Sequence, residues 1–128
     1  MKKIVYTENA PNAIGPYSQA TEINGMVFTS GQIGINPEDG SLELSDLSEE
    51  THQVMKNLKA VLNAAGTDFN EVVKTGIFLK NMDDFATVNE IYSSYFEEAS
   101  GYPARETVQV ARLPKDVNVE ISMIAVKA

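Results

Sequence analysis

The sequence contains no cysteine, no tryptophan and only one histidine among its 128 residues. Without cysteine, the chain can form no disulfide, no thiolate nucleophile and no cysteine-ligated metal centre. The one histidine, His52, falls on the polar side of a predicted helix, where we expect it to be solvated. A Ser/His/Asp triad and a histidine metal cage are therefore both disfavoured, and we predict no metal site.

Positive charge and long apolar runs are also scarce. Ten basic residues against 18 acidic ones give a formal net charge of -8. The basic residues are spread along the chain, so a phosphate backbone would be repelled and nucleic acid is not an expected partner. No run approaches the roughly 18 apolar residues of a membrane span, and the apolar stretch after "MKK" is too short for a signal peptide. We expect a cytoplasmic protein without a membrane partner.

Turn signals and hydrophobic periodicity divide the chain into short elements within one expected domain, residues 1–128. Asn24 and Gly25 are typical of a tight hairpin turn. Alternating and β-branched segments predict strands. These cover residues 3–6, 18–23, 26–34, 71–80, 105–113 and 117–126.

Two helices are predicted among these strands. Ser48 is expected to cap the first, whose apolar positions repeat at helical spacing up to a stop signal at Gly66. The second follows Asp84, which we expect to act as its cap, and carries an aromatic stripe from Phe85 to Phe96. We interpret these aromatic residues as core.

This order of elements predicts an α+β fold, in which one six-stranded mixed sheet has two helices packed on one face. No helix remains to cover the other face. Because the strands carry apolar residues at both parities, we expect the uncovered face to pack against neighbouring subunits. A homo-oligomer is therefore predicted.

Two charges, Arg105 and Glu120, lie inside the last two predicted strands. Strand alternation places Arg105 on one face with Thr107 and Gln109, and places Glu120 opposite the more apolar set of its own strand. Both residues could form an intrasheet salt bridge or simply reach water. Alternatively they form a site, because a fixed guanidinium matches a carboxylate and a nearby glutamate can take a proton from water.

Five segments in order along almost the whole chain resemble the RidA (YjgF-like) family of imine deaminases. They are "APNAIGPYSQA", "FTSGQIG", "NLKAVLNAAG", "KTGIFLKNMDDFATVNEIYSSYF" and "PARETVQVARLPKDVNVEISMIAV". The resemblance implies a chorismate-mutase-like fold assembled as a homotrimer, with sites in clefts between subunits. It also implies cofactor-free hydrolysis of small 2-imino acids such as 2-iminobutanoate and 2-iminopropanoate, released by pyridoxal-phosphate enzymes, to 2-oxo acids and ammonia.

The resemblance also implies roles for individual residues. Arg105 would hold the substrate carboxylate, and Glu120 would activate the water that adds to the imine carbon. The remaining substrate-binding positions are Tyr17, Ser30, Gly31, Asn89 and Thr107. A turn aromatic over the core remains the alternative for Tyr17, and a polar helix flank remains the alternative for Asn89.

The chain departs from the family pattern at two positions. Thr107 stands where many relatives carry cysteine, so thiol reactivity does not transfer to this protein. Glu106 stands where relatives usually carry a small residue. Strand parity turns Glu106 away from Arg105, and we expect a surface or interface role for it.

Two other functions remain open at this point. An arginine-lined cleft could bind 2-oxo acids without turnover, as a sensing or regulatory protein-binding module. Retention of both Arg105 and Glu120 favours catalysis, because carboxylate binding gains nothing from a nearby negative charge. Ribonuclease or translation-inhibitor activity has been attached to distant members, and the net charge of -8 argues against it.

Overall fold

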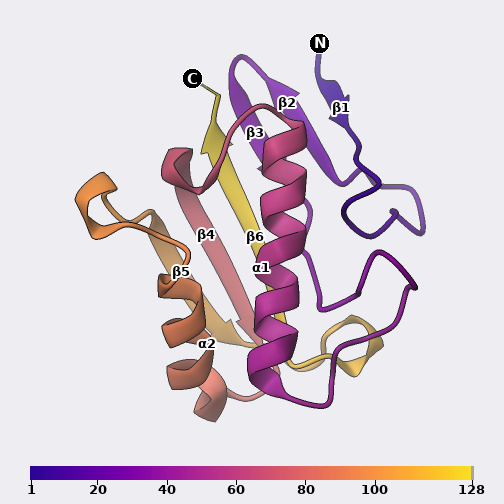
Figure 1. The fold of residues 1–128 in the computed structure, drawn as a ribbon, viewed down its shortest axis with the longest axis vertical. Coiled ribbons are helices and arrows are strands. Elements are labelled where there is room, and N and C mark those ends of the chain that lie inside the picture. The colour runs from indigo at the N-terminus through magenta and orange to yellow at the C-terminus, as the bar shows by residue number, and fades with distance from the viewer. Residues whose placement is uncertain (128) are drawn as a thin grey trace.

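The computed structural model describes residues 1–127 as a six-stranded sheet with two helices on one of its faces (Figure 1). The strands are β1 (Lys3–Val5), β2 (Ala20–Ile23), β3 (Met26–Thr29), β4 (Val72–Leu79), β5 (Ala104–Gln109) and β6 (Val119–Val126). The helices are α1 (Leu47–Ala64) and α2 (Phe85–Ser93). The predicted α+β class is confirmed. Within residues 1–127, neither helix has the length and apolar character needed to cross a membrane.

The strands lie in the order β1-β2-β3-β6-β4-β5, and the sheet is mixed as predicted. All neighbouring pairs are antiparallel except β4 and β5, which are parallel and are connected through α2. The turn between β2 and β3 has positive φ at both central residues, 50° at Asn24 and 77° at Gly25. This pair of angles belongs to the tight hairpin turn that the sequence predicted.

Helix α1 packs its apolar face against the sheet. Val54, Leu58 and Val61 are fully buried at helical spacing, and Gly66 adopts a φ of 85° just beyond the helix end, as predicted. The predicted cap is wrong: Asp46, in an extended conformation, accepts hydrogen bonds from the backbone N–H groups of Ser48 (2.7 Å) and Glu49 (3.4 Å). Ser48 already lies in the first turn, so its N–H is one of the groups that needs a cap.

Helix α2 is shorter than its aromatic stripe. It ends at Ser93, where the hydroxyls of Ser93 and Ser94 bind the carbonyls of Glu90 (2.9 Å) and Ile91 (2.6 Å). Such bonds compete with continuation of a helix. Tyr95 and Phe96 follow in turns and still pack in the core or against it.

The predicted cap of α2 is also wrong. Asp84 precedes the helix, but its side chain makes no capping hydrogen bond. Instead, Asn81 caps the short turn before it by accepting from the N–H of Asp83 at 2.9 Å. The helix therefore begins as a continuation of that turn rather than at a side-chain cap.

His52 is half-buried rather than solvated, which corrects the sequence-based expectation. Its Nδ1 lies 2.8 Å from the hydroxyl of Tyr95, and the two rings pack 5.7 Å apart. The error arose because Tyr95 lies beyond α2, and helical periodicity within α1 gives no sign of a partner from that segment.

The face of the sheet away from the helices carries apolar side chains. Ile4 and Phe28 are aligned through Thr21, and their side chains are 59% and 40% exposed. Val108, further along the same face, is 41% exposed. Apolar side chains gathered on an open sheet face are typical of an interface. The structure thus agrees with the predicted uncovered face.

We predict that Asp46→Ala lowers the free energy of unfolding by about 1 kcal/mol, the usual effect of losing an N-cap side chain. Ser48→Ala should change it by less than about 0.5 kcal/mol, because Ser48 contributes its backbone N–H to this cap. Urea denaturation at one fixed protein concentration measures both values. Equal losses for the two variants would contradict the assignment of Asp46 as the cap.

Candidate functional site

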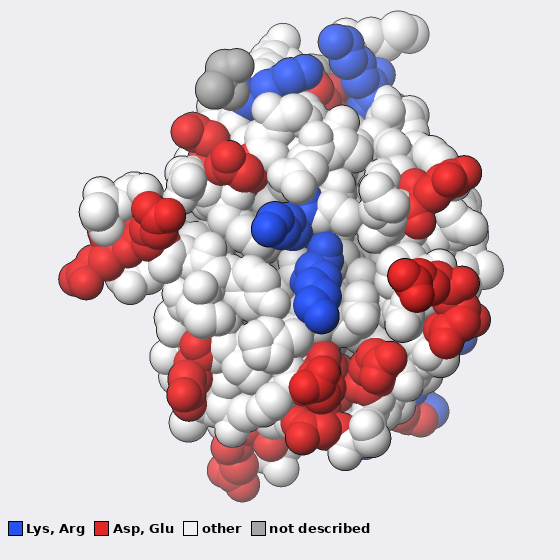
Figure 2. Space-filling model, viewed as in Figure 1, with Lys and Arg blue, Asp and Glu red and all other residues white. Residues whose placement is uncertain are grey.

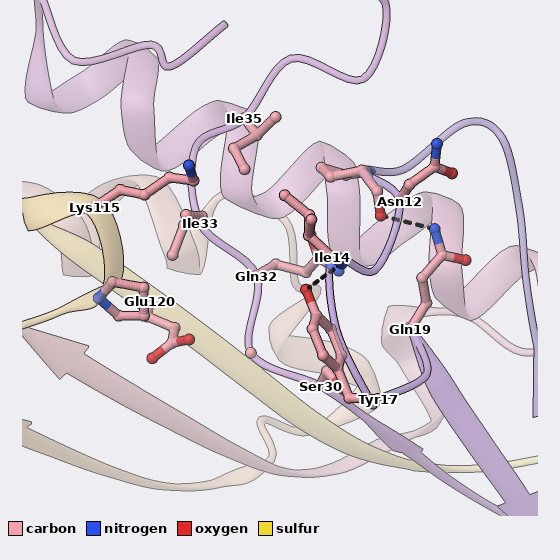
Figure 3. Close-up of a pocket in the computed structure, with 13 residues that line it drawn as sticks. Asn12, Ile14, Tyr17, Gln19, Ser30, Gln32, Ile33, Ile35, Lys115 and Glu120 are labelled. Carbon is pink, nitrogen blue, oxygen red and sulfur yellow. Dashed lines mark hydrogen bonds between the residues drawn. The ribbon is translucent and has the colours of Figure 1, made fainter. Parts of the chain in front are cut away.

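Glu120 enters a cavity of about 500 Å³ from strand β6 (Figure 3). In register it pairs with Phe78 of β4, on the uncovered face of the sheet, and it is half-buried. Burial raises the pKa of the Glu120 carboxyl above its ordinary value of 4.5, and burial is the only cause of this shift. A carboxylate whose pKa moves toward neutrality is suited to accept and return a proton.

The cavity exists because strand β3 stops at Thr29 instead of continuing to residue 34 as predicted. Phe28 pairs with Ile124 of β6, and pairing resumes where Gln32 pairs with Ile121. Three residues lie between Phe28 and Gln32, but only two lie between Ile124 and Ile121. The extra residue is a β-bulge, a feature that commonly redirects a strand beside a functional site. The bulge brings Gly31 against Glu120.

Gly31 leaves the room that the Glu120 side chain occupies. A Cβ atom at Gly31 would lie 2.5 Å from Oε1 of Glu120 and 2.7 Å from its Cδ. The backbone of Gly31 does not require glycine for its φ angle, so the close approach is the reason for glycine at this position. The predicted site residues Gly31 and Glu120 are therefore in contact.

Two more predicted residues line the same cavity. Figure 3 shows the Tyr17 ring across the cavity from Glu120, with Ser30 near it. Tyr17 is 54% exposed, which does not fit a turn aromatic covering the core. The hydroxyl of Ser30 donates to the carbonyl of Ser18 at 2.6 Å, which fixes the chain beside Gly31.

Arg105 lies elsewhere, on the edge strand β5 beneath α2. Its guanidinium packs over the rings of Tyr92 (5.1 Å) and Phe85 (5.4 Å). Its Nη1 donates a 2.6 Å hydrogen bond to Oδ1 of Asn89, so two predicted site residues meet here. The aromatic rings and the amide orient the fork, while the side chain remains exposed.

Thr107 and Glu106 follow the predicted parity. Thr107 lines a shallow pocket with Arg105, and its hydroxyl is buried without a hydrogen-bond partner. Glu106 points to the opposite face and forms a 2.7 Å ion pair with Lys74. Glu106 therefore does not compete for the Arg105 fork.

Arg105 and Glu120 leave the sheet on opposite faces. Arg105 is in register with Thr75, and Thr75 with Met123, both of which are buried under the helices. Glu120 is in register with Phe78 on the other face. The two residues are offset by three positions along the strands, and β4 lies between β5 and β6. Their Cα atoms are therefore about 14 Å apart. The salt bridge that the sequence left open is absent from residues 1–127, and one chain does not bring the two residues into one pocket.

Several lining residues were missed by the sequence reasoning. Gln19 and Lys115 also line the Glu120 cavity. Tyr92 and Tyr102 line a second pocket beside Arg105, which also includes Asn89. Tyr92 was interpreted as core only, although it lies three residues from Asn89 and the two share a helix face. For Gln19, Lys115 and Tyr102 no local pattern gives a signal, because their positions depend on the loops. No cluster of three or more metal-ligating side chains occurs within residues 1–127.

We predict that Gly31→Ala turns the Glu120 carboxylate toward water and lowers its pKa toward 4.5, because the new Cβ takes the space of Oε1. The flexible end of the side chain can move, so the fold should persist. The carboxyl ¹³C shift of Glu120, followed against pH by NMR, measures this. Gly76→Ala is the matched control, since its Cβ would meet Ser122 Oγ at an ordinary 3.5 Å. An unchanged Glu120 titration in the Gly31 variant would contradict the contact.

Comparison with known proteins gives consistent matches over the full length. A RutC family protein of Pyrococcus horikoshii is 50% identical over 127 residues, covering 99% of both chains. A 2-iminobutanoate/2-iminopropanoate deaminase of Salmonella typhimurium is 48% identical over 128 residues, also covering 99% of each. The solved structure of Escherichia coli TdcF with bound serine has a TM-score of 0.93 at 45% identity, covering 98% of this chain and 99% of that one.

The Endoribonuclease L-PSP family matches residues 7–127, nearly the whole chain. Its range includes all seven site residues expected from the sequence motifs. On this match and on the identities above, the protein belongs to the Endoribonuclease L-PSP family, which is the RidA (YjgF-like) family that its motifs resemble.

Proposed function

We propose that the protein hydrolyses small 2-imino acids, such as 2-iminobutanoate and 2-iminopropanoate, to 2-oxo acids and ammonia. The observation that carries this proposal is the half-buried Glu120 carboxyl, which lies against Gly31 in a cavity and whose pKa is raised by burial alone. The name of the Salmonella relative supports the same reaction. The bound serine of the TdcF structure supports a site for small amino-acid-like molecules in that relative.

The site in this proposal lies between two copies of the chain in a homotrimer. Each chain presents Glu120 with Tyr17, Ser30 and Gly31 on one surface and Arg105 with Asn89 on another. The apolar residues on the uncovered sheet face favour burial of that face by a second copy. Such packing can bring the Arg105 of one copy to the Glu120 cavity of its neighbour.

In the proposed reaction, Arg105 binds the substrate carboxylate through two parallel hydrogen bonds. This fixes the imine carbon beside a water molecule at Glu120, so orientation supplies much of the rate acceleration. Glu120 takes one proton from the water as the oxygen bonds to the imine carbon and the C=N π electrons move to nitrogen. The nitrogen takes up this proton from Glu120, giving a carbinolamine.

The carbinolamine then collapses. Glu120 passes a proton to the amine, which leaves as ammonia when the C–N bond breaks, and takes the hydroxyl proton as the C=O bond of the 2-oxo acid forms. Glu120 serves as the local proton carrier through both stages, which its raised pKa suits. The sum is one imine and one water converted to one 2-oxo acid and one ammonia.

The structure favours this reaction over RNA cleavage, although the family description is endoribonuclease. His52, the one histidine, is engaged with Tyr95 and does not line the Glu120 cavity. On the face shown in Figure 2, acidic side chains line much of the rim and basic ones form only small groups. A formal net charge of -8 adds a general repulsion of phosphate.

We predict that Glu120→Ala and Arg105→Ala each lower kcat/KM for imine hydrolysis by about 100-fold or more, through loss of the base and of the charged hydrogen bonds. Threonine dehydratase generates the imine, semicarbazide traps what escapes, and 2-oxo acid formation is measured. Arg112→Ala is the matched control, because Arg112 is the only other arginine and its exposed ion pair with Asp116 contributes little.

A wild-type protein without effect on this assay would refute the proposed reaction. Saturable binding of a 2-oxo acid by that inactive protein would then favour the non-catalytic binding module. RNA cleavage lost equally in Arg105→Ala and His52→Ala would favour the ribonuclease.

A mixing experiment tests the shared site directly. If Arg105 and Glu120 come from different copies, Arg105→Ala and Glu120→Ala chains refolded together at equal ratio regain about a quarter of wild-type activity, because about a quarter of the sites then hold both native residues. Each variant refolded alone is the control. If both residues came from one chain, every site would keep one defect and no activity would return.

A further inference from the structure

Glu50 is a carboxylate in the core that the proposed mechanism does not use. It lies in the first turn of α1 and its exposure is 0%. Gly34 makes room for it, since a Cβ atom there would lie 2.9 Å from Cγ of Glu50. Burial of a carboxylate lowers the stability of the fold unless hydrogen bonds satisfy its oxygens. The hydrogen-bond partners of Glu50 therefore indicate its role.

Both oxygens of Glu50 bind the same residue. Oε2 accepts the backbone N–H of Asn118 at 2.8 Å, and Oε1 accepts Nδ2 of the Asn118 side chain at 2.7 Å. Asn118 immediately precedes β6, and Glu120 is two residues further on. Figure 1 shows the first turn of α1 beside the loop that leads into β6. Glu50 therefore fixes the backbone from which Glu120 projects.

A second part of the cavity wall is held from the same helix. Asn57, two turns after Glu50 and also 0% exposed, donates from Nδ2 to the carbonyls of Ile33 (3.1 Å) and Ile35 (2.9 Å). Ile33 and Ile35 line the cavity. Helix α1 thus holds both the segment that follows Gly31 and the start of β6, the strand from which Glu120 reaches Gly31.

We propose that Glu50 is a positioning residue that holds Glu120 against Gly31 by fixing Asn118. The inference rests on the proposed role of Glu120 as the base. Without the two hydrogen bonds, the start of β6 can shift away from Gly31, and Glu120 gains water. The carboxylate is then misplaced for proton transfer, while Arg105, on a different surface, still binds the substrate carboxylate.

Other titratable or charged groups near Glu120 also influence its pKa and must be the same in all variants compared. Tyr17 and Lys115 are the titratable side chains that line the Glu120 cavity within the chain. Arg105 of a second copy is a further charge in the proposed trimer. All comparisons are therefore made between variants that keep these three residues.

The test compares Glu50→Gln, Glu50→Ala and Asn118→Ala with the wild type. Glutamine replaces one of the two acceptor oxygens with an NH2 group, which would face one of the two Asn118 donors, and alanine accepts from neither. We expect kcat for imine hydrolysis to fall on the order of 10-fold in Glu50→Ala and less in the other two, with KM changed less than about 2-fold. The acid limb of the kcat profile and the Glu120 titration, followed by carboxyl ¹³C NMR, should move to lower pH.

Thr51→Val is the matched control. Thr51 is equally buried in the same helix turn, but its hydroxyl binds only the carbonyl of Leu47, at 2.8 Å, within α1. A loss of stability without a shift of the Glu120 titration is expected in this variant. Asn118→Ala keeps Glu50 and the α1 packing intact, and it provides the measurement if the Glu50 variants do not fold.

An unchanged Glu120 titration and unchanged kcat in folded Glu50 or Asn118 variants would overturn the inference. An equal fall in kcat in Thr51→Val would show that Glu50 contributes only to stability, and this result would also overturn the inference. If wild-type protein hydrolyses no imine, the proposed function fails. The NMR titration then still decides whether Glu50 positions Glu120.

Discussion

The alternation of side chains across β5, β4 and β6 is the constraint on which the candidate site depends. Thr75 of β4 is buried under the helices, and the register places Arg105 beside it. A shift of β5 by one residue would put Glu106 under α2 and Arg105 on the open face. The register that buries the apolar residues of β4 therefore also decides which face each charge occupies.

The interruption of β3 has a comparable influence on Glu120. A regular strand through residue 34 would pair fully with β6 and leave no depression beside Glu120. The bulge at Ser30 and Gly31 opens the cavity without ending the pairing, which resumes at Gln32. As a result the Glu120 carboxyl is partly removed from water, and this burial raises its pKa.

Local patterns predicted much of the fold because they are set by neighbouring residues. The turn at Asn24, the stop at Gly66 and the parity of Arg105 all follow from backbone geometry within a few positions. Contacts between distant segments had no such signal. The separation of Arg105 from Glu120 depends on β4 lying between β5 and β6, which no single strand pattern reveals.

The same distinction between local patterns and tertiary contacts applies to individual residues. Family motifs identified Gly31, but only the tertiary structure shows that its missing Cβ accommodates Glu120. Asp46 displaced Ser48 as the cap because an ionised carboxylate at the extended position before the helix binds the free N–H groups. The burial of Glu50 depends on Gly34 and Asn118, which lie 16 and 68 positions away.

The separation of the two charges within one chain explains how both remain available. A direct Arg105–Glu120 pair would occupy the guanidinium fork and lower the pKa of the carboxyl, so neither would be free for a substrate. Arg105 is instead oriented by aromatic rings and the neutral amide of Asn89, which leave its charge uncompensated. Glu120 is half-buried, and within residues 1–127 it forms no ion pair. In the proposed trimer, two copies bring these surfaces together, so that Arg105 binds the carboxylate of the substrate and Glu120 binds the attacking water.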